Sequence, residues 1–358
     1  MSGTPIRIPM VNLRPMLAAT EPAWSANLDH LFHRMHFILG EQVEAFEQEL
    51  AAALGARYVV GVGSGTAAID LALRVACGKT PGEVIVPALT SPFTAQAVLA
   101  AGHRPRFADV DPDTLLLDAV SAEHWCGRRT VGILPVHLYG QPAAVASLPR
   151  GIPLVQDACQ AHGAPLHYAA PAALSFYPTK NLPCLGDGGA IVTNSRTAAE
   201  RLHQLRDGGR KNDQISRVRA INSRLDEMQA CYLRAFLTKL AEWNAERARL
   251  SKRYDELLDG CGSIRLLQRR PGSVCHLYVV RVRRREGVRQ RLAAKGIATG
   301  VHYPVPLHLQ PAFREFGPAR GELPEAERAC REILSLPLWP GLADNQVEEV
   351  ASELRAAV

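Results

Sequence analysis

Short apolar runs alternate with stretches of helical periodicity through the first two thirds of the chain. Val43, Phe46, Leu50 and Leu54, for example, recur at the spacing of one helix face. The expected strands lie at 58–62, 84–87, 106–108, 131–136, 152–156, 173–177 and 190–193, and the expected helices at 42–54, 67–76 and 94–101. Residues 1–20 are expected to be irregular. Strands that alternate with helices predict a mainly parallel central sheet covered by helices on both faces, which is an α/β fold.

The pattern changes near residue 225. A long helical stretch is expected over 225–258 with a break near Glu242. It is followed by an expected strand at 276–282 and expected helices at 287–295, 324–334 and 347–357. A chain of 358 residues is long for one hydrophobic core. We therefore expect a large domain over residues 1–244 that carries the sheet, and a smaller α+β domain over residues 245–358.

The amino-acid composition indicates the class of protein but not its function. Hydrophobic residues make up 47% of the chain and charged residues 21%, as in ordinary globular proteins. The net charge of +6 is modest, and no nucleic-acid-binding motif accompanies the arginines. No apolar run approaches the length of a membrane-spanning helix, and the N-terminus shows no secretory pattern. These features give no support for nucleic acid or a membrane as a partner, and anionic substrates remain compatible with the arginines.

The eight cysteines suggest neither disulfides nor a metal site. They form no C-x-x-C pair, and no Cys/His group has the spacing of a zinc site. We interpret them as reduced thiols in the cytoplasm and expect no bound metal.

Lys180 lies between two apolar runs that are expected to be strands. Pro178 ends the first run because it has no N–H group, and several glycines after the lysine allow the chain to return. A lysine on such a loop lies close to the core, where desolvation lowers the pKa of its ammonium group. The free amine that results can form a Schiff base with an aldehyde. A solvated surface lysine is the alternative that this stretch alone leaves open.

Two other positions offer chemistry at the ends of expected strands. The Gly63-Ser-Gly-Thr66 stretch opens a helix after a strand, where backbone N–H groups and the helix dipole suit a phosphate. It lacks the glycine spacing of a dinucleotide fingerprint, and a plain strand–helix turn remains an alternative. Asp157 follows an expected parallel strand, at the sheet edge where α/β proteins bind ligands. A carboxylate there suits a pyridinium nitrogen, although a helix N-cap would also use an Asp.

The glycine-containing turn at 63–66, Asp157 and Lys180 follow one another along the chain, and this order indicates a particular family more strongly than any one of the three features does. The stretches Asp157-Ala-Cys-Gln-Ala-His-Gly163 and Ser175-Phe-Tyr-Pro-Thr-Lys-Asn-Leu182 are the most characteristic. Further matching segments lie at 65–68, 86–88, 136–141, 222–227 and 302–304, together with His308. The chain resembles the DegT/DnrJ/StrS family of sugar aminotransferases, which use pyridoxal 5'-phosphate (PLP) on the aspartate aminotransferase fold, fold type I. The resemblance runs from about residue 30 to the C-terminus.

The resemblance implies the residues that hold the reactive part of PLP. Lys180 would hold the cofactor as a Schiff base and later move a proton between the cofactor carbon and the sugar carbon. Asp157 would keep the pyridine nitrogen protonated, so that the ring draws electrons from the reacting carbon. Gln160 would bond near the phenolic oxygen.

The resemblance also implies a shared phosphate site. Gly65, Thr66 and Ser175 would bind the phosphate of PLP, and Asn222 would reach it from the second subunit of a homodimer.

One position departs from the family pattern. An aromatic residue that stacks on the pyridine ring commonly follows the Thr matching Thr90, but this chain has Ser91 there. Phe93 would point the same way if the segment were extended, and Pro92 favours an extended Ser91. We therefore expect Phe93 to take over the stacking, with a packed core Phe as the alternative.

The resemblance finally implies the substrates. The donor would be L-glutamate and the acceptor a keto group on a nucleotide-linked sugar, contacted by Arg219, His302, Tyr303 and His308. Two alternatives stay open. One is a keto-cyclitol as the acceptor, and the other is a regulatory protein that keeps the PLP fold without turnover.

Overall fold

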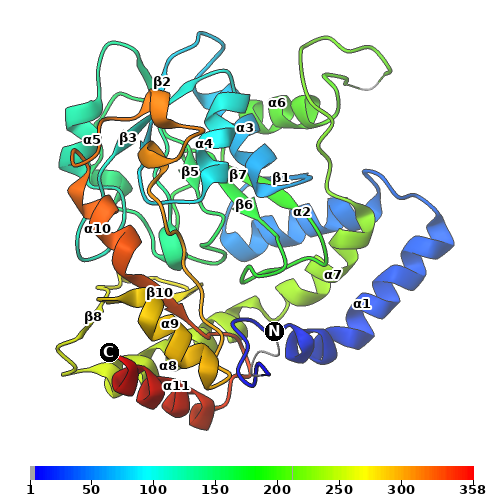
Figure 1. Ribbon diagram of the computed structural model, residues 1–358. Helices are drawn as coiled ribbons and strands as arrows, with labels where there is room; N and C mark the ends of the chain where they lie inside the picture. Colours follow the sequence, from blue (N-terminus) through cyan, green and yellow to red (C-terminus); the bar gives the residue numbers. More distant parts are fainter. Residues whose placement is uncertain (1–4, 212) are drawn as a thin grey trace.

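The computed structural model describes residues 5–211 and 213–358. The strands of the large domain are β1 (Tyr58–Val62), β2 (Glu83–Pro87), β3 (Arg104–Ala108), β4 (Thr130–Ile133), β5 (Gln156–Asp157), β6 (Ala172–Ser175) and β7 (Gly189–Thr193). Its helices are α1 (Arg14–Arg34), α2 (Glu41–Leu54), α3 (Gly65–Ala76), α4 (Pro92–Ala100), α5 (Ala119–Trp125), α6 (Arg196–Arg206) and α7 (Glu227–Leu237). The regular elements therefore alternate as the sequence pattern predicts, and Figure 1 shows how they are arranged.

The strands of the large domain form one sheet in the order β1-β7-β6-β5-β4-β2-β3. Two ladders are joined by parallel bridges of Leu154 to Ile133 and of Asp157 to Val136. β7 runs antiparallel to both of its neighbours, β1 and β6, whereas the other pairs are parallel. The expectation of a mainly parallel sheet in an α/β fold is confirmed.

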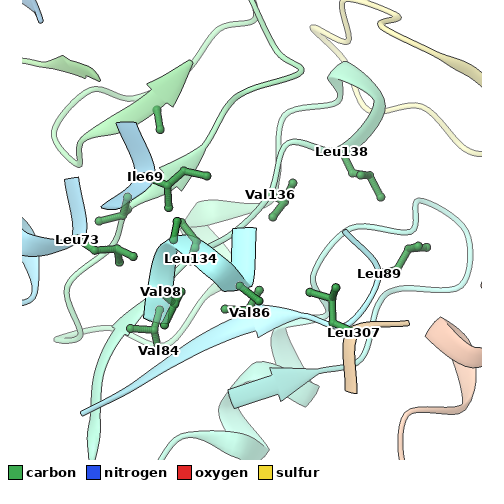
Figure 2. Packing of buried hydrophobic residues seen from close by; sticks show 14 of the residues in the cluster. Ile69, Leu73, Val84, Val86, Leu89, Val98, Leu134, Val136, Leu138 and Leu307 are labelled. Atoms are coloured by element: carbon green, nitrogen blue, oxygen red, sulfur yellow. The ribbon is translucent and has the colours of Figure 1, made fainter. Parts of the chain in front are cut away.

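Helices cover both faces of this sheet, as the side-chain pattern of its strands requires. In β1, Val60 and Val62 belong to one buried cluster and Val59 to the other, because successive strand residues point to opposite faces. The first cluster includes residues of α3, α4 and α6, and the second includes residues of α2 and α7. Figure 2 shows part of the first cluster, in which Ile69 and Leu73 of α3 pack near side chains from several strands.

The smaller part of the chain has an antiparallel sheet. Its elements are β8 (Ile264–Leu266), β9 (Tyr278–Val282), β10 (Ile333–Leu336), α8 (Leu240–Leu258), α9 (Arg285–Ala294), α10 (Pro324–Glu332) and α11 (Asp344–Ala357). The strand order is β10-β9-β8. α8, α9 and α11 lie beside this sheet in the lower part of Figure 1. Their side chains form a separate buried cluster with those of the sheet. These elements form an α+β unit, and the boundary between the two domains at residues 244 and 245 stays a prediction.

Residues 307–330, which the sequence assigns to the small domain, pack against strands of the large sheet. Phe313 packs edge-on against Phe107 of β3, with 6.3 Å between ring centroids. The carboxylate of Asp109 accepts hydrogen bonds from the backbone N–H groups of Glu325 and Ala326, at 3.0 and 2.7 Å. This segment therefore returns to the large domain, because its apolar side chains complete the core beside β2 and β3.

Other differences from the expected elements are local. α1 begins at Arg14, so the expectation of an irregular 1–20 segment is wrong for its second half. The long helical stretch breaks between α7 and α8, at Thr238 and Lys239, a few residues before Glu242. Among the described residues, no helix combines the length and apolar character needed to cross a membrane. No cluster of His, Cys, Asp and Glu suited to a metal ion occurs among them either.

Candidate active site

The candidate site lies where three strands of the large sheet end together. The register pairs Gly189, the first residue of β7, with Val62 at the end of β1 and with Ser175 at the end of β6. Asp157 ends β5 and pairs with Ala173, two residues before Ser175. The sheet thus brings the helix that follows β1, the carboxylate and the lysine loop to one edge, as is usual for ligand sites in α/β folds.

The N-terminus of α3 packs closely against this edge. A Cβ atom added at Gly65 would lie 2.5 Å from the Cβ of Ser175, so only glycine allows this approach. A Cβ at Gly189 would lie 2.5 Å from the backbone of Ser64. The first turn of an α-helix has N–H groups without intrahelical partners, and here Gly65 and Thr66 supply them beside the Ser175 hydroxyl. This donor set fits a phosphate group.

Asp157 is 4% exposed, and both of its carboxylate oxygens accept hydrogen bonds. The hydroxyl of Thr94 donates to Oδ2 at 2.7 Å, and the backbone N–H of Cys159 donates to Oδ1 at 3.1 Å. Thr90 lies 3.2 Å from Thr94 and must be the donor of that pair, since the hydroxyl proton of Thr94 is directed at Asp157. These bonds hold a buried carboxylate in one orientation, which fits the nitrogen of a pyridinium ring.

Lys180 lies in a turn after β6, where its backbone N–H donates to the carbonyl of Tyr177 at 2.8 Å. The side chain is partly buried. Burial lowers the pKa of its ammonium group, while the nearby Cys159 and Asp157 act in the opposite direction. More of the free amine is therefore present at a given pH than for a surface lysine, as a Schiff-base lysine requires.

Three buried histidines lie near enough to Lys180 for its charge to lower their pKa values. Burial, with a further contribution from Lys180, lowers the pKa of His162 to about 3 and that of His302 to about 4. The pKa of His276 falls well below its usual value for the same two reasons. The three imidazole rings are therefore neutral at physiological pH.

Gln160 connects the Asp157 turn to the His302–Tyr303 segment. Its Oε1 accepts a hydrogen bond from the backbone N–H of Tyr139 at 2.7 Å, and its Nε2 donates to the hydroxyl of Tyr303 at 3.4 Å. The Tyr139 hydroxyl donates to the carbonyl of His302 at 2.6 Å. Burial raises the pKa of Tyr303 to about 12, so its phenol keeps its proton. The structure therefore brings Gln160, His302 and Tyr303 together next to the Asp157 turn.

Two candidate residues, Phe93 and His308, lie in surroundings that differ from those the sequence predicted. Phe93 was expected on an extended segment, but α4 begins at Pro92 and places Phe93 in its first turn, 64% exposed. Ser91 is extended as expected and caps this helix, because its hydroxyl accepts the N–H of Phe93 at 3.3 Å. His308 is completely buried, and its Nε2 lies 3.3 Å from the carboxylate of Glu327 in α10. Direct contact of His308 with a substrate is therefore not supported.

Arg219 and Asn222 lie on the strap, the segment of chain between α6 and α7. Asp207 forms an antiparallel bridge with Asn222, and the side chains of Arg219 and Asn222 are exposed. Arg217 and Arg224, in contrast, form ion pairs with Asp213 and Asp207, at 2.6 and 2.9 Å. The roles expected for Arg219 and Asn222 stay predictions.

Sequence reasoning missed two groups that the structure places here. Thr94 is 63 residues from Asp157, and Asn181 bonds the imidazole of His276, 95 residues away. Neither contact leaves a local sequence signal. The only sequence feature that pointed to Asn181 is its position directly after Lys180 in the characteristic stretch 175–182.

Comparison with known proteins agrees with this geometry. A sequence model described as the DegT/DnrJ/EryC1/StrS aminotransferase family matches residues 22–355. The chain belongs to this family. Members of the family are PLP-dependent aminotransferases of fold type I, and the fold, enzyme class and cofactor expected from the sequence are confirmed.

Individual members of the DegT/DnrJ/EryC1/StrS family resemble the chain over nearly its whole length. The dTDP-3-amino-3,4,6-trideoxy-alpha-D-glucose transaminase of Streptomyces venezuelae is 40% identical, over 98% of this chain and 96% of the relative. A UDP-N-acetyl-3-dehydro-alpha-D-glucosamine 3-aminotransferase of Acidithiobacillus ferrooxidans is 37% identical, over 97% of each chain. The crystal structure of S. venezuelae DesV with a ketimine intermediate has a TM-score of 0.94 at 40% identity, covering 99% of this chain and 98% of that one.

Proposed function

We propose that the protein transfers an amino group from L-glutamate to a keto group on a nucleotide-linked sugar, with PLP as its cofactor. The observation that carries the proposal is the meeting of three groups at one sheet edge: the first turn of α3, the buried Asp157 carboxylate and Lys180. Relatives at 35–40% identity that are named as dTDP-sugar and UDP-sugar aminotransferases support the substrate class.

The residues of the site divide between holding PLP and moving protons. Gly65, Thr66 and Ser175 would hold the phosphate, and Asp157 would pair with the ring nitrogen. PLP supplies an electron sink that stabilises negative charge on the carbon that loses its proton. The amine of Lys180 would take up that proton and return it, because burial keeps a fraction of the amine free.

The acceptor sugar would bind on the side of the site that His302 and Tyr303 form. Tyr303 and His302 would contact the sugar, since both lie next to Gln160 and Tyr139. A nucleotide diphosphate carries charges that need cationic or N–H partners outside the PLP pocket. Arg219 is an exposed guanidinium that could meet this need, whereas Arg217 is already paired with Asp213. A keto-cyclitol would carry no such charge, and this difference separates the two acceptor classes.

The acceptor class can be tested with the donor and acceptor half-reactions measured separately. Arg219→Ala should weaken binding of the keto-sugar nucleotide about tenfold, the loss expected for one charge-assisted contact. The glutamate half-reaction should be unchanged, because glutamate has no diphosphate. Arg217→Ala is the matched control and should affect neither. The measurement is a single-turnover titration with each substrate, with free UDP or dTDP added as a competitor.

A different outcome would contradict the nucleotide-sugar acceptor. Efficient amination of an uncharged keto-cyclitol, with no inhibition by either nucleotide, would reject the nucleotide-sugar acceptor and favour the cyclitol.

A homodimer with shared sites follows from the expected role of Asn222. Its side chain is exposed in the single chain, on the strap between α6 and α7. If Asn222 completes the phosphate site of the partner, chains with Lys180→Ala and chains with Asn222→Ala should be inactive alone. Mixed dimers should regain one intact site. Activity of mixed dimers after verified subunit exchange is the measurement, and an absence of rescue would assign both residues to the same chain's site.

A regulatory protein is the second candidate function, and the name of one relative supports it. A Geobacillus stearothermophilus relative named as a pleiotropic regulatory protein is 38% identical over 98% of each chain. Lys180 and Asp157 are both retained here with the environment that turnover needs, which favours the enzyme. Loss of the visible absorbance of bound PLP on addition of glutamate would identify the enzyme, and an unchanged spectrum would identify the regulator.

A further inference from the structure

The residue directly after Lys180 is the centre of a buried hydrogen-bond chain. The side chain of Asn181 is 1% exposed and bonds three groups. Its Nδ2 donates to Asn244 Oδ1 at 2.8 Å and to the carbonyl of Val274 at 2.9 Å. Its Oδ1 lies 3.0 Å from Nδ1 of His276. One amide thus ties the lysine loop to α8 and to the segment that leads into β9.

Only one assignment of donors and acceptors fits this series of hydrogen bonds. Asn244 Nδ2 donates to the carbonyl of His162 at 2.8 Å, so Asn244 presents its oxygen to Asn181. Both hydrogens of the Asn181 amide are then used by oxygen acceptors, and its Oδ1 must face His276. An amide oxygen can only accept a hydrogen bond. His276 Nδ1 must therefore carry the proton, and the ring has the neutral Nδ1–H tautomer.

His276 is itself held firmly at the junction of the two domains. Its backbone N–H donates to the carbonyl of Tyr139 at 2.9 Å, and its carbonyl accepts from Arg247 Nη1 at 3.3 Å. Arg247 also donates to the carbonyl of Leu338 at 3.0 Å. Asn244 and Arg247 are three residues apart in α8, so they lie on the same face of the helix. The helix that links the domains therefore holds both Asn181 and His276.

The loop that carries Lys180 depends on side-chain hydrogen bonds to hold its position. Residues 176–188 contain neither helix nor strand, so few backbone bonds hold the loop in place. The amine of Lys180 stands at the end of a flexible stem whose position depends on this backbone. Errors of about 1 Å in the position of a reacting group can reduce a rate on the order of 100-fold.

We propose that His276 is a positioning residue for Lys180 and acts through Asn181: its Nδ1–H fixes the amide that anchors the lysine loop to α8. The proposal rests on the role proposed above for Lys180. His276 stays uncharged in this role, because burial and the cations around it, Lys180 and Arg247, lower its pKa, as do His162 and His302. The anchoring bond is therefore a neutral one that does not change through the physiological pH range.

Two substitutions at the same position separate this role from a general structural one. His276→Asn places an amide nitrogen near the position of Nδ1 and keeps the donor to Asn181. His276→Gln reaches toward the position of Nε2 and loses that donor. We expect His276→Asn to retain the wild-type kcat within about threefold, and His276→Gln to lower kcat about 10- to 100-fold with little change in KM.

A second measurement follows Lys180 without the cofactor. In the apo-protein, the pH dependence of acylation of Lys180 by an amine-specific reagent reports the pKa of its amine. The profile should be unchanged in His276→Asn. It should move to higher pH in His276→Gln, because a released loop exposes the amine to water and removes the effect of burial. His103→Gln is the matched control, because His103 is 3% exposed and precedes β3 at the opposite edge of the sheet.

The outcomes distinguish this proposal from the proposed function. ¹⁵N NMR of the wild-type apo-protein should show the Nδ1–H tautomer of His276, and the Nε2–H tautomer would overturn the proposal without any variant. Equal effects of His276→Asn and His276→Gln on the acylation profile would also overturn it. If borohydride does not fix PLP on Lys180 in the wild type, the proposed function fails instead.

Discussion

We expect Lys180→Ala to abolish transamination and to reduce kcat by at least about 10³-fold, because in the proposed mechanism one amine both holds the cofactor and moves the proton. Lys180→Arg should lose as much activity. The guanidinium stays protonated at any accessible pH, and it cannot form a Schiff base. Single-turnover conversion of glutamate measures the loss. Borohydride reduction of the PLP-loaded wild type, followed by peptide mapping, should place the label on Lys180.

Lys295→Ala is the control for this experiment. Lys295 is a surface lysine that pairs with Glu353 at 3.2 Å, and its loss should leave both activity and the PLP label unchanged. A label on any lysine other than Lys180, or activity of Lys180→Ala near that of the wild type, would contradict the assignment. Because burial lowers the pKa of the Lys180 amine, an amine-specific reagent should modify Lys180 at lower pH than it modifies a free lysine side chain.

Asp157→Asn should reduce kcat by about 10²- to 10³-fold, the second largest effect expected in this protein. The amide can keep the hydrogen bond from the N–H of Cys159, but it cannot hold a positive charge on the pyridine nitrogen. Thr94→Val should act in the same direction and more weakly. It removes the hydroxyl that donates to Asp157 Oδ2 at 2.7 Å, and about tenfold weaker PLP binding is expected.

The measurements for this pair are the dissociation constant of PLP and the rate of the glutamate half-reaction. Thr20→Val is the matched control, since Thr20 is also buried and its hydroxyl donates to the carbonyl of Met16 in α1, away from the site. Equal effects of Thr94→Val and Thr20→Val on PLP binding would show that the Thr94 hydroxyl does not act through Asp157.

The local features of the candidate site could be read directly from the sequence. The strand that ends at Asp157, the helix that begins at Gly65 and the turn that holds Lys180 each depend on residues within a few positions of one another. Apolar runs, glycines and a proline mark such boundaries because they act on the nearby backbone. Sequence therefore determined the fold class and the three groups that carry the proposed chemistry.

The contacts between distant residues were decided by tertiary structure alone. Thr94 reaches Asp157, and Asn181 reaches His276, because the strand order and register of the sheet bring their segments together. His308 is removed from the expected substrate site for the same reason: residues 307–330 return to the large domain, and α10 buries the ring beside Glu327. Phe93 lies in the first turn of a helix and not on an extended segment, because α4 begins one residue before it. Side-chain direction and long-range pairing depend on how whole elements pack, which no short stretch of sequence specifies.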